Sequence, residues 1–168
     1  YSQYKENIEA IQKEVYEKAR QTSLETFEKA VSDDLSVALL LIKDNQIEAM
    51  AISGTASNFP TERILRRDSE FEDTKTLYMV DCTVRPGHQG KGLGRQIKAA
   101  LNLLAMSEGK NKVVGRNRDR LAGAMLSINL SLGAREEYYV PEDYPDFEQY
   151  RDVFYYNNEL QWSDQDYR

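Results

Sequence analysis

The sequence contains one cysteine and one histidine, Cys82 and His88, and this scarcity excludes several kinds of site. A single cysteine cannot form a disulfide within the chain, which fits a reducing compartment, and we therefore expect a cytoplasmic protein. A serine–histidine–aspartate or cysteine–histidine centre would depend on His88 alone. A zinc cage normally takes several histidine or cysteine ligands, so we expect no metal site.

Long hydrophobic runs and an excess of basic residues are also missing. No apolar run approaches the ~18 residues that cross a bilayer, and the first ten residues lack the pattern of a secretory signal. The 28 acidic residues outnumber the 22 basic residues, which gives a formal net charge of −6. Because proteins that bind nucleic acids usually carry a basic face, we expect neither a nucleic acid nor a membrane as partner.

The 168 residues are 40% hydrophobic and 30% charged, as is ordinary for a globular protein, and this length suits one domain with a real core. Apolar periodicity predicts helices over residues 4–20, 23–31 (capped by Ser23), 93–109 and 121–132. Apolar runs predict strands over residues 37–42, 47–53, 76–84, 112–115, 135–140 and 152–160. Residues 58–74 suggest a long loop or a short helix. The order of elements predicts an α/β fold with a mixed central β-sheet flanked by helices.

The most informative stretch is the glycine-rich segment that follows the predicted strand 76–84. A P-loop has a glycine, four residues and then Gly-Lys-Ser/Thr; Gly87 and Gly92 have this spacing, but Leu93 and Gly94 follow. A dinucleotide-binding fingerprint requires Gly-x-Gly-x-x-Gly, and here the third glycine falls one place early. Neither pattern fits.

A third pattern, Q/R-x-x-G-x-G/A, matches residues 89–94 at a predicted junction of strand and helix. The first N–H groups of a helix have no partner inside the helix, and the helix dipole is positive there. Glycine lets an anion approach these groups closely because no Cβ stands in the way. Lys91 and Arg95 add positive charge, so the segment is predicted to bind a pyrophosphate.

With the strand before it and the amphipathic helix after it, this segment resembles the acetyl-coenzyme A-binding motif of the GNAT N-acetyltransferase superfamily, and the resemblance covers roughly residues 8–160. It implies a GNAT-like acyl-CoA N-acyltransferase fold with acetyl-CoA as cosubstrate. It also implies that the pyrophosphate is held at Gln89, Gly90, Lys91, Gly92, Leu93, Gly94 and Arg95.

The resemblance further implies where the rest of the coenzyme lies. Cys82 and Val84 would offer backbone groups to the pantetheine arm and to the thioester carbonyl, in a gap where their strand separates from the strand at 112–115. Asn117 is a further candidate contact of the pantetheine arm. Many members of the family carry a tyrosine, thought to protonate the leaving thiolate, at the position of Asn129. An amide has no proton to give at neutral pH, so Asn129 can only donate a hydrogen bond to the sulfur, and a packing role is equally open.

Acetylation of an amine also requires a group, or a chain of waters, that takes a proton from the attacking ammonium. Asp81 and Tyr78 are the first candidates because they lie on the strand nearest the thioester. Strict alternation along a strand would place them on opposite faces, so that only one of them would face the cleft. Glu136, Glu137 and Tyr138 are further candidates, and a surface or packing role stays open for each.

The segment 141–152 is rich in acidic residues and tyrosine. In this fold the loop between the last two strands often borders the acceptor cleft. Glu142, Asp143, Asp146 and Glu148 would give that border a negative potential that suits an amine, although a solvated acidic loop is an equally good interpretation.

These features predict an acetyl-CoA-dependent N-acetyltransferase that acts on a small-molecule amine by direct attack in a ternary complex. Two alternatives stay open, a non-catalytic acyl-CoA-binding module of a larger protein and a protein N-acetyltransferase. Residues 1–7 lack the strand with which the family usually begins. We therefore expect one GNAT-like domain over residues 1–168, and either excision from a longer chain or trimming of its start would explain the missing strand. A homodimer or a covalently linked neighbouring domain stays open as a further partner.

Overall fold

The structure is a computed structural model that describes residues 2–59, 74–119, 123–144 and 152–161. Its α-helices are α1 (Lys5–Val15), α2 (Leu24–Ala30), α3 (Leu93–Ser107) and α4 (Gly123–Ser131). Its strands are β1 (Val37–Lys43), β2 (Gln46–Thr55), β3 (Thr76–Val84), β4 (Lys112–Arg118), β5 (Arg135–Val140) and β6 (Val153–Glu159).

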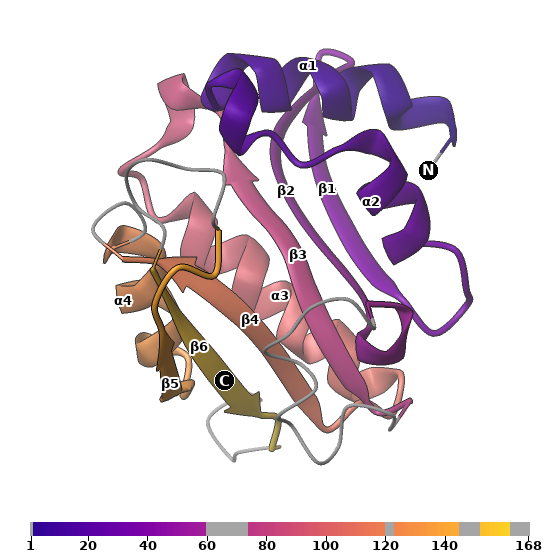
Figure 1. The fold of residues 1–168 in the computed structure, drawn as a ribbon. Helices are drawn as coiled ribbons and strands as arrows, with labels where there is room; N and C mark the ends of the chain where they lie inside the picture. Colours follow the sequence, from indigo (N-terminus) through magenta and orange to yellow (C-terminus); the bar gives the residue numbers. More distant parts are fainter. Residues whose placement is uncertain (1, 60–73, 120–122, 145–151, 162–168) are drawn as a thin grey trace.

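The strands form one sheet in the order β1-β2-β3-β4-β6-β5 (Figure 1). β3 and β4 pair in parallel, and the other neighbours pair antiparallel. One face of the sheet packs against α1 and α2 through side chains such as Ile11 and Phe27. The other face packs against α3 through side chains such as Ile97 and Leu101, and α4 lies on this same face. The predicted mixed sheet flanked by helices is confirmed.

Local sequence signals predict the hairpin and the second helix well. The turn between β1 and β2 places Asp44 and Asn45 at φ 49° and 59°, a conformation that these two residue types tolerate better than most. Ser23 caps α2, since its hydroxyl oxygen accepts a hydrogen bond of 3.1 Å from the backbone N–H of Thr26. The cap at Ser23 confirms the prediction, and the turn falls between the two strands predicted at 37–42 and 47–53.

The first helix is shorter than predicted. It ends at Val15, and Tyr16 takes an extended conformation instead of continuing to residue 20. The hydroxyl of Tyr16 lies 2.9 Å from the hydroxyl of Thr83 on β3, and the side chain of Gln21 donates to the carbonyl of Tyr16. These tertiary contacts outweigh the helical periodicity of residues 16–20, of which Lys18–Arg20 form a short 3-10 turn.

A β-bulge in β3 overturns one prediction. The register between β2 and β3 shifts between Ile52 and Ser53, so that two residues of β2 face three of β3, from Met79 to Asp81. The extra residue breaks the strict alternation of side chains. Tyr78 joins the core under α1 and α2, and Asp81 is hydrogen-bonded to Gln12 of α1. The prediction of opposite faces was therefore wrong, and both side chains lie on the α1 face.

Other bounds differ by less. β4 continues past the predicted residue 115 to Arg118, because pairing with β6 extends it through polar residues that carry no strand signal. The predicted loop at 58–74 lies largely outside the described residues.

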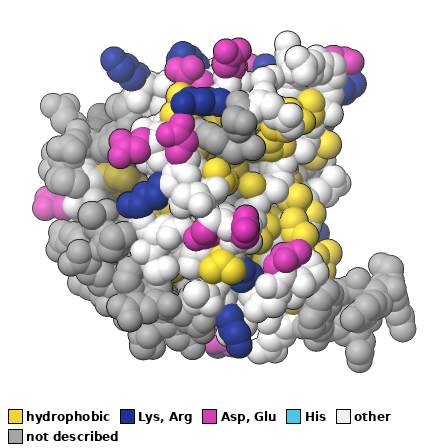
Figure 2. Space-filling view, turned by 90° about the vertical axis from the view of Figure 1, so that its right-hand side faces the viewer, with side chains coloured by type: hydrophobic (Ala, Val, Ile, Leu, Met, Phe, Trp, Pro, Cys, Tyr) yellow, Lys and Arg dark blue, Asp and Glu magenta, His cyan; other side chains and the backbone are white. Residues whose placement is uncertain are grey.

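Figure 2 shows one side of the molecule, on which acidic and basic side chains of the described residues are interspersed. Within the described ranges, no helix has the length and apolar character needed to cross a bilayer, and no metal-binding group of histidine, cysteine and acidic side chains is gathered.

Candidate active site

The centre of the site is a gap between β3 and β4. The two strands pair only over Thr76–Tyr78 and Lys112–Val114, although β3 runs on to Val84 and β4 to Arg118 (Figure 1). Beyond the paired ends each strand keeps its other neighbour, β2 for β3 and β6 for β4. The facing edges of β3 and β4 therefore present backbone groups that no strand in this sheet takes up.

Those edge groups belong to the residues predicted to meet the coenzyme. The N–H of Arg85 donates to the carbonyl of Glu48 on β2 at 2.9 Å. Because backbone groups alternate in direction along a strand, Thr83 also turns toward β2, whereas Cys82 and Val84 turn toward the gap. The structure thus places the backbone of Cys82 and Val84 where a pantetheine arm could pair with it as an additional strand would.

The glycine segment forms an open cradle directly after β3. Gly92 is the N-cap of α3 and has φ 79°, and Gly90 has φ 73°. A Cβ added to either glycine would meet no other atom within 4 Å, so the space in front of the backbone is clear. The first helical bond runs from Gln96 to the carbonyl of Gly92, which leaves the N–H groups of Leu93, Gly94 and Arg95 for an anion.

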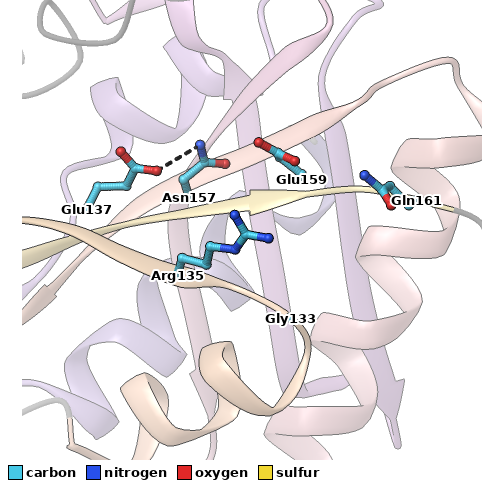
Figure 3. A pocket seen from close by; sticks show the side chains of 6 residues that line it. All are labelled: Gly133, Arg135, Glu137, Asn157, Glu159 and Gln161. Carbon is cyan, nitrogen blue, oxygen red and sulfur yellow. Dashed lines mark hydrogen bonds between the residues drawn. The ribbon is translucent and has the colours of Figure 1, made fainter.

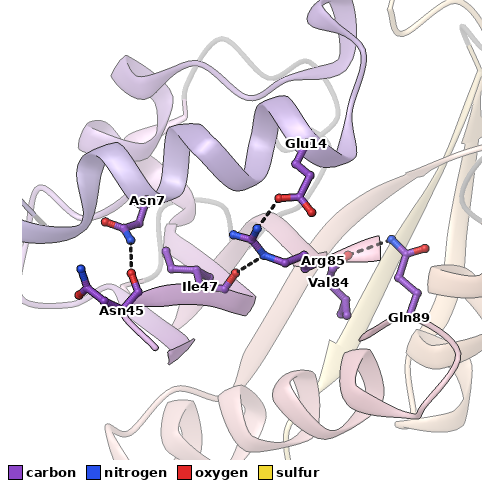
Figure 4. A network of polar contacts seen from close by, with 7 residues as sticks. All are labelled: Asn7, Glu14, Asn45, Ile47, Val84, Arg85 and Gln89. Atoms are coloured by element: carbon purple, nitrogen blue, oxygen red, sulfur yellow. Dashed lines mark hydrogen bonds and ion pairs between the residues drawn. The ribbon is translucent and has the colours of Figure 1, made fainter. Parts of the chain in front are cut away.

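Side chains of the segment stabilise this turn (Figure 4). Gln89 donates to the carbonyl of Val84 at 2.9 Å, and Lys91 donates to the carbonyl of Gly87 at 2.9 Å. Arg85 donates to the carbonyl of Ile47 at 3.0 Å and pairs with Glu14 of α1. The end of β3, the start of the cradle and α1 are therefore tied together. The carbonyl of Val84, which accepts the hydrogen bond from Gln89, is also one of the backbone groups that the resemblance assigns to the pantetheine arm.

Two asparagines meet on the α3 face of the gap. Asn129 of α4 donates to the side-chain oxygen of Asn117 on β4 at 3.2 Å, and both side chains are buried. Asn117 Nδ2 and Asn129 Oδ1 are buried atoms without a hydrogen-bond partner among the described residues. Buried polar atoms normally find partners, so this unused donor and acceptor fit the amide groups of a pantetheine arm.

On the opposite face, Asp81 is surrounded by hydrogen-bond donors. Its carboxylate accepts from Gln12 at 3.0 Å, from Thr22 at 3.3 Å and from the hydroxyl of Thr83. Burial raises the pKa of Asp81 to about 6, although the three hydrogen bonds oppose this change. The hydroxyl of Tyr16 touches Thr83, and burial raises its pKa above the ordinary value. Asp81 is thus poised to gain or lose a proton near neutral pH.

The predicted negative border of the acceptor side is only partly present. Asp143 forms an ion pair of 2.7 Å with Arg116, and its side chain is 3% exposed, so its charge is neutralised inside the structure. Arg116 also donates to the hydroxyl of Tyr78 at 2.9 Å, and Arg118 lies 4.0 Å from the ring centroid of Tyr144. The expectation that Asp143 supplies free negative potential was therefore wrong. Asp146 and Glu148 lie outside the described residues.

The further base candidates on β5 lie away from the gap. Glu136 and Glu137 are exposed, and Tyr138 stacks on Tyr155 with ring centroids 5.7 Å apart. Figure 3 shows a polar surface pocket on this part of the sheet. It is lined by Gly133, Arg135, Glu137, Asn157, Glu159 and Gln161. Asn157 and Glu159 pair with Val114 and Lys112 of β4, at the end where β3 and β4 are still joined, so this pocket is separate from the gap.

Sequence reasoning missed several residues around the gap. Gln12 and Arg116 were not predicted, because nothing local distinguishes them from solvated polar residues. Lys98 was also missed, although its position between Ile97 and Leu101 on the apolar side of α3 was a usable signal. Its Nζ donates to the hydroxyl of Tyr156 on β6 at 2.9 Å, and Lys98 is 1% exposed.

Comparisons with known proteins identify the fold. No family model matches the sequence, and no curated protein matches it either. The ribosomal-protein-S18-alanine N-acetyltransferase from Escherichia coli superposes with a TM-score of 0.75 at 16% identity, over 97% of this chain and 92% of that chain. The protein yncA from Salmonella typhimurium, solved with its cofactor acetyl-CoA, gives 0.68 at 22% identity, over 95% and 91%.

An acetyltransferase of the GNAT family from Staphylococcus aureus Mu50 gives a TM-score of 0.67 at 14% identity, over 96% of each chain. These similarities span nearly the whole length of both chains compared. Because the sequence identities are low, the similarities show the fold alone. They agree with the parallel strand pair that separates beside a glycine-rich helix start. The chain therefore has the fold of the GNAT acetyltransferases.

Proposed function

We propose that this chain is an acetyl-CoA-dependent N-acetyltransferase that moves the acetyl group to the amine of a small molecule by direct attack. One observation carries the proposal. β3 and β4 separate after three pairs of residues, and the opened edge has the glycine cradle on the α3 side and the perturbed carboxylate of Asp81 on the α1 side. Donor and acceptor could therefore meet through the sheet from opposite faces.

The residues on the donor side fit acetyl-CoA. The backbone N–H groups of the cradle from Gly90 to Arg95 would hold the pyrophosphate, with charge from Lys91 and Arg95. The edge groups of Cys82 and Val84 and the unused atoms of Asn117 and Asn129 would hold the pantetheine arm. Acetyl-CoA supplies an activated acyl group, and a backbone N–H at the gap would polarise its carbonyl.

Asp81 is the base that we favour for the acceptor side. A base works best when its pKa lies near the working pH, and the pKa of about 6 leaves most of Asp81 ionised at pH 7. The other candidate, Tyr78, accepts a hydrogen bond from Arg116 and belongs to the core under α1. We therefore assign Tyr78 a positioning role.

Two further functions each have one observation in their favour. The Escherichia coli protein with this fold is an N-acetyltransferase of a ribosomal-protein alanine, which favours a protein N-terminus as acceptor. Asn129 cannot give a proton, which favours a non-catalytic acyl-CoA-binding module. Both are separable from the main proposal by experiment.

The decisive experiment mixes the chain with acetyl-CoA and a panel of acceptors, while free thiol is measured. The panel holds amino acids, polyamines, a lysine peptide and a peptide with an N-terminal alanine. We expect thiol release with at least one small amine and formation of its N-acetyl product. Release with the alanine peptide alone would favour the protein acetyltransferase. Binding of acetyl-CoA without thiol release across the panel would favour the binding module, and failure to bind acetyl-CoA would contradict all three.

A further inference from the structure

Lys98 is a buried lysine that has no role in the binding of acetyl-CoA or of the acceptor as described so far. It lies in the second turn of α3, faces the sheet and is 1% exposed. Its Nζ donates to the hydroxyl of Tyr156 at 2.9 Å and lies 4.6 Å from the centroid of that ring. A buried ammonium is costly, and a titratable pair of this kind inside a protein is a candidate functional site.

The hydroxyl of Tyr156 lies where β3 and β4 separate. Tyr156 pairs with Gly115 of β4, the residue that follows the last pair between β3 and β4 at Val114. A Cβ added to Gly115 would lie 2.5 Å from the Tyr156 hydroxyl oxygen, so this hydroxyl fits only beneath a glycine. Tyr156 belongs to the core on the α3 face, which is the side of the gap that holds the coenzyme cradle.

Other groups around this hydroxyl come from three elements. Burial raises the pKa of Tyr156 well above the ordinary value. Cys82 and Tyr78 of β3 raise this pKa further, and a hydrogen bond with Asn129 of α4 lowers it. Lys98 of α3 completes the set. Tyr156 therefore keeps its proton at neutral pH, whereas burial lowers the pKa of Lys98 to about 8.

In the proposed function, acetyl transfer would release a thiolate on this face of the gap, where the cradle lies. The described side chains there differ in their capacity to protonate it. Asn117 and Asn129 are amides and have no proton to give. Burial raises the pKa of the Cys82 thiol to about 11, although the nearby charge of Lys98 opposes this change. Tyr156 has a hydroxyl proton and a hydrogen-bonded ammonium behind it that can replace that proton.

We propose that Tyr156 is the catalytic acid that protonates the departing thiolate of coenzyme A, and that Lys98 is the positioning residue that restores its proton. This inference rests on the proposed function. The amine nitrogen bonds to the acetyl carbon, the C–S bond then breaks, and its electron pair goes to the sulfur. The Tyr156 proton passes to the sulfur, the Lys98 ammonium reprotonates the tyrosinate, and solvent reprotonates Lys98. The amine gives up one proton to Asp81 and from there to solvent, so protons balance over the cycle.

The first test needs no turnover. Binding of coenzyme A is compared with binding of desulfo-coenzyme A, which lacks the thiol, for the wild type, Tyr156→Phe and Tyr155→Phe. We expect the wild type to bind coenzyme A about fivefold more tightly, as one hydrogen bond to sulfur would give, and Tyr156→Phe to lose this preference. Tyr155→Phe is the matched control, since it removes a buried hydroxyl from the same strand on the other face and keeps the preference.

The second test uses turnover. Tyr156→Phe is expected to lower kcat by about 10²-fold, the low end for general acid catalysis, with KM for acetyl-CoA unchanged. We expect the wild type to lose activity above pH 8, as Lys98 loses its proton. Lys98→Met, which replaces a buried charge by a side chain of similar volume, is expected to fold and to lack this pH dependence.

Three outcomes would overturn the inference. The first is that the wild type binds coenzyme A and desulfo-coenzyme A with equal affinity. The second is that Tyr156→Phe weakens the binding of both ligands by the same factor. The third is that kcat is unchanged in Tyr156→Phe. Absence of thiol release by the wild type with every amine would contradict the proposed function instead. The binding comparison would then still decide whether the Tyr156 hydroxyl touches the sulfur.

Discussion

The two sides of the strand gap differ in what they are made of. On the α3 side, the groups available for a coenzyme are largely backbone, namely the N–H groups after Gly92 and the edge of β3 at Cys82 and Val84. On the α1 side, they are side chains brought from distant parts of the chain, as in the contacts of Asp81 with Gln12 and of Arg116 with Asp143.

This difference has a physical consequence for each side. A backbone site depends on conformation, so only substitutions that change φ or block the approach should damage it. A site of buried side chains depends on each hydrogen bond and charge, and loss of one partner leaves the other unsatisfied. Coenzyme binding by the glycine cradle should therefore tolerate most substitutions, whereas the acceptor side should be sensitive to conservative ones.

The largest effect is expected when the acceptor side loses its base. Asp81→Asn should lower kcat for acetyl transfer roughly 10²- to 10⁴-fold because the proton acceptor is lost. The Kd for acetyl-CoA should stay the same, since Asp81 lies on the other face. Steady-state kinetics and calorimetry measure both quantities. Asp33→Asn is the control, because Asp33 is a hydrogen-bonded aspartate beside the hairpin and should leave kcat unchanged. An unchanged kcat in Asp81→Asn would exclude Asp81 as the base.

Breaking the ion pair of the acceptor side should reduce stability. Arg116→Met leaves Asp143 buried without its partner, which costs roughly 3–5 kcal/mol of the free energy of unfolding. Urea denaturation measures this loss. The control Lys5→Met breaks a pair whose side chains are 44% and 50% exposed, and should cost less than about 1 kcal/mol. Equal losses in the two variants would show that Asp143 is effectively solvated.

The stability of the wild type should carry a pH signature of Asp81. Its pKa of about 6 in the folded chain exceeds the ordinary 3.8, so the folded state holds the extra proton between these values. The stabilisation is complete below pH 4 and is lost as the pH rises through 6, with a difference of about 3 kcal/mol. Unfolding of the wild type and of Asp81→Asn across pH 4–8 measures it. A constant difference between the two across this range would contradict the raised pKa.

The smallest of these effects tests the donor side. Gly92→Val should weaken coenzyme A binding about 100-fold, or about 2.7 kcal/mol, because a β-branched residue disfavours φ 79° and its side chain enters the cradle. Calorimetry measures this affinity. Gly87→Ala is the matched control, since Gly87 has no positive φ and its Cβ would meet no other atom within 4 Å. If both variants bind coenzyme A like the wild type, the cradle is not the pyrophosphate site.

Much of the fold was predictable because its signals are local. The cap at Ser23, the turn at Asp44 and Asn45, and the helix start at Gly92 each depend on a few adjacent residues, and all three were predicted at the right place. The end of α1 was not predictable in this way. The helical periodicity continues past Val15, and only the contact of Tyr16 with Thr83, far away in the sequence, stops it.

The sequence by itself determined the glycine cradle proposed to hold the pyrophosphate, because contiguous residues fix the direction of backbone N–H groups at a helix start. Only the tertiary structure decided the rest. One extra residue in β3 turns Asp81 to the α1 face, and the pairing of β6 with β4 brings Tyr156 beneath Gly115 and against Lys98. Side chains separated by up to about 70 residues meet through strand register and sheet order, and neither is a property of any single segment.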